Sequence, residues 1–434
     1  MPPSPRVPSG PTTTASVTES VAKRNLLRQL RASDLRGVAR LATQATAGLS
    51  RVAEGVHQSV LGTMGLPGGK EPGRARGLTG LVYQSIRGVT QWVDVGLQAG
   101  LARLEPFFTP AAAATSDVLW EREAVIAALN GVMGDRLLQD HNPLCTSMGF
   151  YQAGRPLDVQ ALGASGRATG KLLVLLHGLC MNDLQWQHDG HDHGAYLAQA
   201  LGYTPVYLRY NTGLHTSTNG AALSAMLDGL VDAWPVPVTE MAVLAHSMGG
   251  LVARSACHQA AHTQAPARAS RWLPLLRHLV FLGTPHHGAP LERAGHWVDV
   301  LLGSTPYSRP FTRLAQLRSG GITDLRYGHV TDADWQGRDR FRATPDRRTP
   351  VPLPPHVACY AVAATLAARR SPAAERLVGD GLVPLRSALG VHDEPARDLC
   401  FGKQRQAVFY RLGHLALLGD TGVARQMAQW MEPV

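Results

Sequence analysis

Short apolar runs alternate with amphipathic stretches from about residue 145 onward. The apolar runs predict buried strands at 171–178, 204–210, 241–247, 276–285, 356–365 and 406–413. Between and after them, apolar residues recur on one side of predicted helices at about 194–201, 218–234, 248–262 and 415–431. Because alternating strands and helices favour a mostly parallel sheet with helices on both faces, we expect an α/β domain over 145–434.

The first third of the chain has a different pattern. Residues 1–20 are rich in Pro, Ser and Thr and hold few large apolar side chains, which predicts a disordered tail. From 21 to 140, apolar residues recur at three- and four-residue spacing in stretches that are interrupted by a segment dense in Gly and Pro; these stretches are 21–61, 78–104 and 116–138. We therefore expect an N-terminal helical region before the α/β domain.

A serine between a predicted strand and the following helix has the setting of a nucleophile elbow. Ser247 follows the apolar run MAVLAH, and the residues two positions before and after it, Ala245 and Gly249, are small. Small residues are needed there because the sharp turn strains the backbone of the serine. Ala245 stands where glycine is more usual, and His246 directly precedes the serine. The alternative interpretation is a serine that caps an ordinary helix.

A serine nucleophile needs a histidine to take its proton and an acid to orient that histidine. In hydrolases with this elbow, the acid and then the histidine follow the serine along the chain. Asp380, in the loop VGDGLVP, is the preferred acid, with Asp393 and Asp398 as second choices. His414, just past the last predicted strand, is the preferred base, with His392 as the alternative. An Asp–Gly pair such as 380–381 is also typical of an ordinary turn.

The end of the first predicted strand, LLVLLHGL, has the pattern of an oxyanion loop. Backbone N–H groups aimed at the oxygen of a tetrahedral intermediate each lower the activation free energy of the reaction by about 3–4 kcal/mol. Leu179 and Met248 are expected to supply these N–H groups, and His177 to orient the loop beside the substrate. The alternative is a plain turn between strand and helix.

Five segments together resemble the α/β-hydrolase superfamily, and within it bacterial lipase-like proteins related to the GPI inositol-deacylase group. They are LLVLLHGL (172–179), VLAHSMGGLVARS (243–255), VFLGTPHHGAP (280–290), GDGLVP (379–384) and GHLALL (413–418). The resemblance covers about 145–432. It implies an α/β-hydrolase fold and cleavage of carboxylic esters through an acyl-enzyme, with Ser247, Asp380 and His414 as the triad. It does not imply a particular substrate.

The preferred hypothesis is a serine esterase or lipase acting on a small-molecule or lipid ester without a cofactor. A second hypothesis keeps the same residues but makes the protein an acyltransferase or thioesterase. A third is a non-catalytic scaffold or membrane-associated protein on a relict hydrolase fold. The motif HDGHDH (188–193) contains residues that bind metals, but a polar loop before a helix explains it better, so we expect no metal.

The segment 289–355 has no clear strand pattern and is too long for a plain connection in a compact domain. It is therefore a candidate lid or cap over the active site. Trp297, Leu301 and Phe311 are the apolar residues in it that we expect to face an acyl chain. An inserted packing helix with no gating role is the alternative.

Composition narrows the remaining possibilities. The net charge of +10 is spread along the chain without a nucleic-acid-binding motif, so nucleic acid is not an expected partner. Five scattered cysteines and the lack of a secretory pattern predict a cytoplasmic location. The basic amphipathic N-terminal helices either lie on an anionic lipid surface, which would make the protein membrane-peripheral, or pack against the hydrolase core. The sequence leaves the oligomeric state open.

Overall fold

The computed structural model describes residues 36–37, 40, 120–262, 269–289, 319–339, 346–368 and 379–432. The predicted tail 1–20 and the predicted helix 78–104 lie outside these residues, as does nearly all of 21–61. The chain divides into two compact units, Met1–Arg122 with Asn142–Leu144, and Glu123–His141 with Cys145–Val434. In the first unit, the Asn142 side chain donates a hydrogen bond to the Gly37 carbonyl (3.0 Å).

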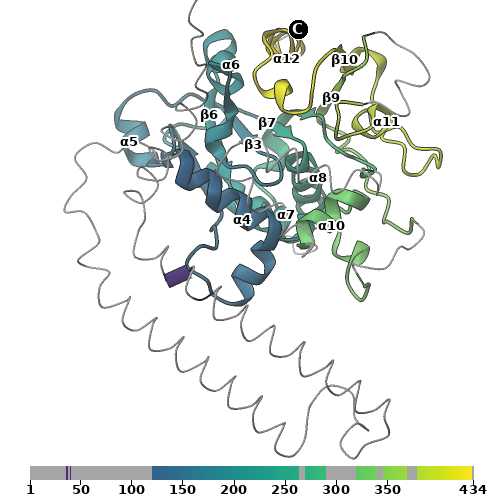
Figure 1. The fold of residues 1–434 in the computed structure, drawn as a ribbon. Helices are drawn as coiled ribbons and strands as arrows, with labels where there is room; N and C mark the ends of the chain where they lie inside the picture. The colour runs from purple at the N-terminus through teal and green to yellow at the C-terminus, as the bar shows by residue number, and fades with distance from the viewer. Residues whose placement is uncertain are drawn as a thin grey trace, which may run out of the picture. The chain divides into compact units, whose positions relative to one another are not determined.

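An eight-stranded sheet forms the centre of the second unit, with the order β10-β9-β8-β7-β3-β6-β1-β2 (Figure 1). Neighbouring strands from β10 to β6 are parallel, whereas β1 is antiparallel to both β6 and β2. The strands are β1 Gly149–Gln152, β2 Arg155–Pro156, β3 Lys171–Leu176, β6 Thr204–Arg209, β7 Glu240–His246, β8 Leu276–Leu282, β9 Ala358–Thr365 and β10 Gln406–Tyr410. All six predicted strands are confirmed. The short strands β1 and β2 were not predicted, and neither was the separate ribbon of β4 (Gln187–His188) and β5 (His191–Asp192).

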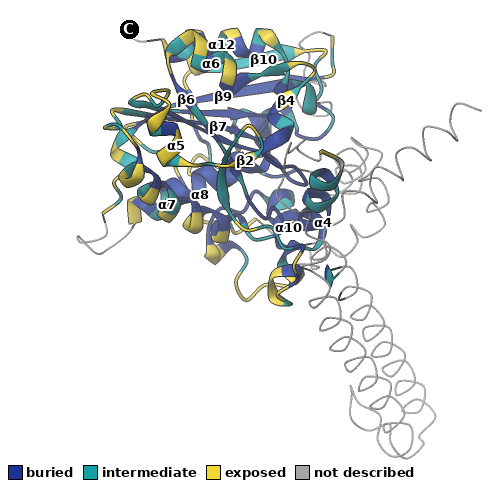
Figure 2. Cartoon of the chain, turned by 90° about the vertical axis from the view of Figure 1, so that its left-hand side faces the viewer, coloured by how far each residue is buried: buried dark blue, intermediate teal, exposed yellow. Residues whose placement is uncertain are grey.

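Helices cover both faces of the sheet, and the alternation along β3 shows how. Leu172, Val174 and Leu176 join a core cluster with residues of α7 (Thr216–Ala233) and α8 (Met248–His262). The intervening Leu173 and Leu175 join a different cluster with residues of α6 (His193–Leu201) and α12 (Thr421–Met431). Side chains alternate across a strand, so a strand buried on both faces is a continuous apolar run. The result is the expected α/β fold, a mostly parallel sheet of buried strands between helices that expose their outer sides (Figure 2).

The predicted helices at 194–201, 218–234 and 248–262 are confirmed as α6, α7 and α8. The helix predicted from 415 to 431 is wrong at its start. Leu415–Leu418 form a separate 3₁₀ turn, η9, and α12 begins at Thr421. The Asp420 side chain accepts a hydrogen bond from the Val423 N–H (2.9 Å) and caps α12, which fixes the later start.

The described part of the insertion 289–355 contains α10 (Gly320–Tyr327) and the 3₁₀ turn η6 (Asp332–Asp334). The candidate lid residues Trp297, Leu301 and Phe311 lie outside the described residues. Helix α10 is joined to the start of α7, because the buried Asp324 carboxylate accepts hydrogen bonds from the Thr216 N–H (2.7 Å) and the His215 ring (3.0 Å). Among the helices that the structure describes, none is both long and apolar enough to cross a membrane.

Candidate active site

Ser247 occupies a strained turn between β7 and α8. Its φ of +55° is unusual for a residue other than glycine. The Ser247 N–H donates a hydrogen bond to the Leu282 carbonyl at the end of β8 (2.8 Å). A side-chain carbon added at Gly249 would lie 2.5 Å from the Leu176 carbonyl oxygen, and Ala245 is fully buried. The small residues on both sides of the serine are therefore required by packing, as the elbow motif predicts.

His414 and Asp380 form a buried hydrogen-bonded pair. His414 Nδ1 lies 2.7 Å from Asp380 Oδ2, and the His414 N–H donates to the Asp380 carbonyl (3.0 Å). The other carboxylate oxygen, Oδ1, accepts hydrogen bonds from the N–H groups of Leu382 (2.9 Å) and Val383 (2.7 Å). With Nδ1 donating to a carboxylate, the neutral imidazole carries its acceptor on Nε2, which is the atom a general base uses.

The end of β8 connects the elbow to this pair. Leu282 binds the Ser247 N–H, and the next residue, Gly283, has a φ of +56°. A side-chain carbon added at Gly283 would lie 3.1 Å from His414 Nδ1 and 3.2 Å from Asp380 Oδ2. The structure thus brings the three predicted residues to the same edge of the sheet, where Ser247 follows β7, the Asp380 loop bonds to the residue after β9, and His414 lies just past β10. Crevices at these strand ends are where open α/β sheets bind ligands.

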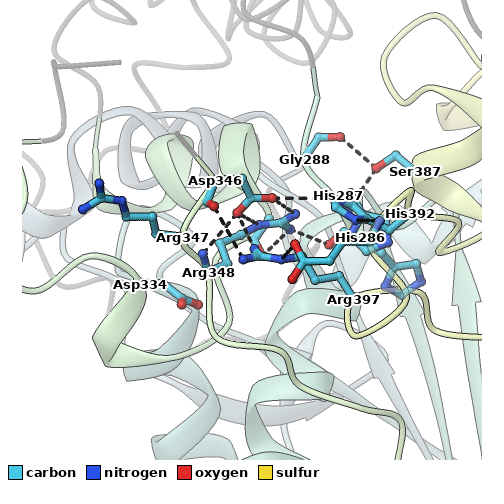
Figure 3. A network of polar contacts seen from close by, with 12 residues as sticks. His286, His287, Gly288, Asp334, Asp346, Arg347, Arg348, Ser387, His392 and Arg397 are labelled. Carbon is cyan, nitrogen blue, oxygen red and sulfur yellow. Dashed lines mark hydrogen bonds and ion pairs between the residues drawn. The ribbon is translucent and has the colours of Figure 1, made fainter. Parts of the chain in front are cut away.

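The second-choice acids and the second-choice base interact with other groups. Asp393 is 94% exposed and pairs with Arg386. Asp398 accepts a hydrogen bond from the His392 N–H (3.3 Å). The His392 ring itself lies 3.7 Å from Asp346, in a network of arginine and aspartate side chains (Figure 3). The geometry therefore favours Asp380 and His414 over these alternatives.

The loop after β3 lies against the elbow. A side-chain carbon added at Gly178 would lie 3.0 Å from Ser247 Cβ, so glycine allows this close approach. Within the described residues, the N–H groups of Leu179 and Met248 donate no hydrogen bond. Both residues are buried, and two unused N–H groups beside the serine are the arrangement that an oxyanion hole needs.

His177 is the first residue of this loop and is fully buried. Its ring stacks on Tyr210, with ring centroids 4.4 Å apart, and the Tyr210 hydroxyl donates a hydrogen bond to the His177 carbonyl (2.7 Å). Burial lowers the pKa of His177 to about 3, so the ring is neutral near pH 7. These contacts fit a role in orienting the loop.

Helix α4 (Trp120–Gln139) packs against the loop after β3, a contact that the sequence did not indicate. A side-chain carbon added at Gly131 would lie 3.0 Å from the Cα and N of Cys180, and closer still to its sulfur. The Asn182 side chain donates a hydrogen bond to the Glu123 carbonyl (3.1 Å). Glycine inside a helix costs about 1 kcal/mol relative to alanine and therefore usually has a packing reason, which was the available signal.

Two histidines of the HDGHDH segment, His191 and His193, direct ring nitrogens at other groups of the protein. His191 Nε2 lies 2.9 Å from His193 Nδ1, and His193 Nε2 lies 2.8 Å from the Leu417 carbonyl oxygen. Asp192 caps α6 and accepts a hydrogen bond from the Tyr207 hydroxyl (2.8 Å). Over the described ranges, no group of three or more His, Cys, Asp or Glu residues is placed to hold a metal ion.

No protein-family model matches the chain, and no curated protein matches it in sequence. Several solved structures are similar to it. The mature lipase BlEst2 of Bacillus licheniformis is 17% identical with a TM-score of 0.36, and the match covers 59% of this chain and 91% of the lipase. The esterase Pf2001 of Pyrococcus furiosus is 14% identical (TM-score 0.35; 61% and 84% covered), and lipase B of Aspergillus fumigatus is 10% identical (TM-score 0.34; 75% and 63% covered).

Proposed function

We propose that this protein is a serine hydrolase that cleaves carboxylic esters through an acyl-enzyme. The observation that carries the proposal is the buried His414–Asp380 pair beside a serine that is held at φ +55° on a strand-to-helix turn. Backbone strain of this kind costs about 1–3 kcal/mol and persists where the surrounding structure enforces it, most often at functional sites. A relict fold would have no need to retain both the strained serine and the paired imidazole.

In the proposed reaction, Ser247 Oγ attacks the ester carbonyl carbon while its proton passes to His414 Nε2. The carbonyl oxygen becomes an oxyanion that accepts hydrogen bonds from the Leu179 and Met248 N–H groups. His414 then gives the proton to the departing alkoxide, which leaves as an alcohol, and Ser247 holds the acyl group. Water attacks the acyl-enzyme with His414 again as base, and collapse of the second intermediate releases the carboxylic acid and restores Ser247.

Asp380 remains ionised throughout and stabilises the imidazolium that forms at each proton transfer. Its Oδ1 is held by the Leu382 and Val383 N–H groups, so Oδ2 keeps a fixed direction toward His414. Ser247 Oγ makes no hydrogen bond within the described residues. Catalytic hydrogen bonds commonly tighten only when substrate binds, so we expect the Oγ–Nε2 contact to form in the substrate complex.

The proposed substrate is a small-molecule or lipid ester, and the triad requires no cofactor. Within the superfamily, we place the chain with bacterial lipase-like proteins related to the GPI inositol-deacylase group, because of its GTPHHG and AHSMGG segments. An alcohol or thiol acceptor in place of water would use the same residues. Product analysis with added short-chain alcohols, and a comparison of oxygen esters with thioesters, separates these reactions.

Labelling with a fluorophosphonate probe tests the proposal directly. We expect the wild type to be labelled and Ser247→Ala to be unlabelled and inactive on p-nitrophenyl esters of increasing chain length. Ser255→Ala is the matched control, because Ser255 is another buried serine, on the helix α8 that follows Ser247, and it should be labelled like the wild type. An unlabelled wild type, or a labelled Ser247→Ala protein, would refute the assignment.

A further inference from the structure

Two buried imidazoles contact the backbone of the short turn that carries His414. His246 Nε2 lies 3.2 Å from the His414 carbonyl oxygen. His193 Nε2 lies 2.8 Å from the carbonyl oxygen of Leu417, three residues further along. Both histidines are 0% exposed. They reach this turn from different elements, since His246 ends β7 and His193 begins α6.

The hydrogen bonds fix the tautomer of each ring. A carbonyl oxygen only accepts hydrogen bonds, so Nε2 must carry the proton in both His246 and His193. In a neutral imidazole Nδ1 is then an acceptor, and His191 Nε2, 2.9 Å from His193 Nδ1, is placed to donate to it. The result is an ordered chain of donors that runs from His191 through His193 to the Leu417 carbonyl.

Burial keeps both rings neutral. It lowers the pKa of His193 to about 4 and that of His246 well below its usual value. His191 and Asp420 are the charged or titratable groups that act on His193, and they act in opposite directions. His246 is next to the His414 ring, with ring centroids 4.7 Å apart. Neither bond to the turn therefore depends on an ionised partner.

The turn needs such support. Leu415–Leu418 form a single 3₁₀ turn, and the His414 side chain makes no capping bond to it. Hydrogen-bond geometry in 3₁₀ turns is poorer than in α-helices. The Asp380 carboxylate orients the imidazole ring of His414, but it fixes the position of the ring only if the backbone beneath is also fixed.

We propose that His246 and His193 are positioning residues that hold the 414–418 turn, so that His414 stays directed at Ser247. The proposal rests on the proposed function, in which His414 is the base. His246 and His193 together fix the carbonyl groups of His414 and Leu417, one at the start and one near the end of the turn. A displacement of about 1 Å at a reacting group costs about a hundredfold in rate.

His193 is the better position for the test, because His246 also borders the nucleophile. His193→Leu removes the hydrogen bond to Leu417 and replaces the imidazole with an apolar side chain of similar bulk. His193→Gln keeps a side-chain N–H that can donate to the same carbonyl. His258→Leu is the control, since the His258 ring contacts the His262 ring on α8, with centroids 4.1 Å apart, and is not part of the contacts around the turn.

We expect His193→Leu to lower kcat by about ten- to a hundredfold with KM nearly unchanged, because substrate binding does not depend on the position of the base. His193→Gln should stay within about threefold of the wild type in kcat, and His258→Leu should be unaffected. A wild-type kcat in His193→Leu, or an equal loss in His193→Gln in a folded protein, would overturn the proposal.

A proton NMR measurement tests the positioning without relying on activity. The Nδ1 proton of His414, which is bonded to Asp380, should give a low-field resonance in the wild type and in Ser247→Ala. We expect this resonance to shift or broaden in His193→Leu and to persist in His193→Gln. An unchanged resonance in His193→Leu would overturn the positioning role, whether or not the wild type hydrolyses an ester. A wild type that hydrolyses no ester would instead count against the proposed function.

If His193→Leu does not fold, His191→Phe provides a second variant. His191 is only half-buried, and its loss removes the donor to His193 Nδ1. The His193 proton can then move to Nδ1 and leave Leu417 without a donor. We expect a smaller shift of the same low-field resonance, and an identical spectrum would contradict the proposed chain of donors.

Discussion

Replacing Gly131 with alanine should impair catalysis from a helix that contributes no catalytic group. In an exposed helix interior this change stabilises a protein by about 1 kcal/mol, because alanine has the higher helix propensity. At Gly131 the added methyl group would lie 3.0 Å from the Cα and N of Cys180, and closer still to its sulfur. Ordinary carbon contacts begin at about 3.5 Å, so α4 and the oxyanion loop must separate by about half an ångström to one ångström.

That displacement acts on the residue next to Leu179, whose N–H is a proposed oxyanion donor. Loss of one such donor costs about 100- to 1,000-fold in kcat, and a partial misalignment should cost at least about tenfold. Overpacking should also lower the free energy of unfolding by about 1–3 kcal/mol. Because the substrate ester in its ground state gains little from the oxyanion donors, KM should change much less than kcat.

The assay compares kcat and KM on a p-nitrophenyl ester with the midpoint of thermal unfolding. Gly229→Ala on α7 is the matched control, because a side-chain carbon added there meets no atom within 4 Å apart from its chain neighbours and the nearby backbone of its own helix. It should be fully active and at least as stable as the wild type. Adding Cys180→Ala to Gly131→Ala removes the closest clash and should recover part of the lost kcat. Wild-type kcat in the folded Gly131→Ala protein would refute the reasoning.

Three further changes test other parts of the site. Asp380→Asn should lower kcat by about 10⁴-fold without unfolding the protein, because the amide no longer selects the reactive tautomer of His414; single-turnover kinetics would show it, and a loss of less than tenfold would contradict it. Gly283→Ala should lower both kcat and the unfolding midpoint, because the position has φ +56° and the added methyl group would lie 3.1 Å from His414 Nδ1. A fully active, equally stable variant would argue against this packing. His193 has a folded-state pKa of about 4 against a usual value of 6.5, so the unfolded chain binds the extra proton and stability is lost as the pH falls from 6.5 toward 4. That loss amounts to about 2 kcal/mol at pH 5, and urea unfolding of His193→Gln at pH 7 and pH 5 should show a flatter pH dependence than the wild type.

Elements buried on both faces were predictable from the sequence, whereas elements of mixed exposure were not. β3 is continuously apolar because different helices cover its two faces, and it was identified at its observed start. β1 is half-buried throughout and β2 is exposed, so neither carries a periodic signal. The start of α12 was misplaced because the apolar residues of η9 continue the helical pattern through Asp420.

The candidate catalytic residues could be found because chain order and local motifs constrain them. The groups that support them could not, because their roles depend on contacts between distant parts of the chain. His246 meets the His414 carbonyl across 168 residues, and His193 meets the Leu417 carbonyl across 224. A histidine in a polar loop before a helix has no sequence feature that marks such a partner. The contact of Gly131 with Cys180 is equally invisible until the fold places α4 behind the loop.

The packing of α4 determines where a truncated form of the protein should begin if its apolar core is to remain covered. A boundary drawn at the first strand would start a truncated protein near residue 145 and discard the helix. Ala128 and Val132 share a core cluster with Leu179, Met248 and Leu251, so their removal would expose to water the apolar side of the loop after β3 and the start of α8. A fragment that begins before Trp120 keeps this surface covered. We expect the longer fragment to be soluble and the shorter one to aggregate, a practical consequence for crystallisation and for enzyme engineering.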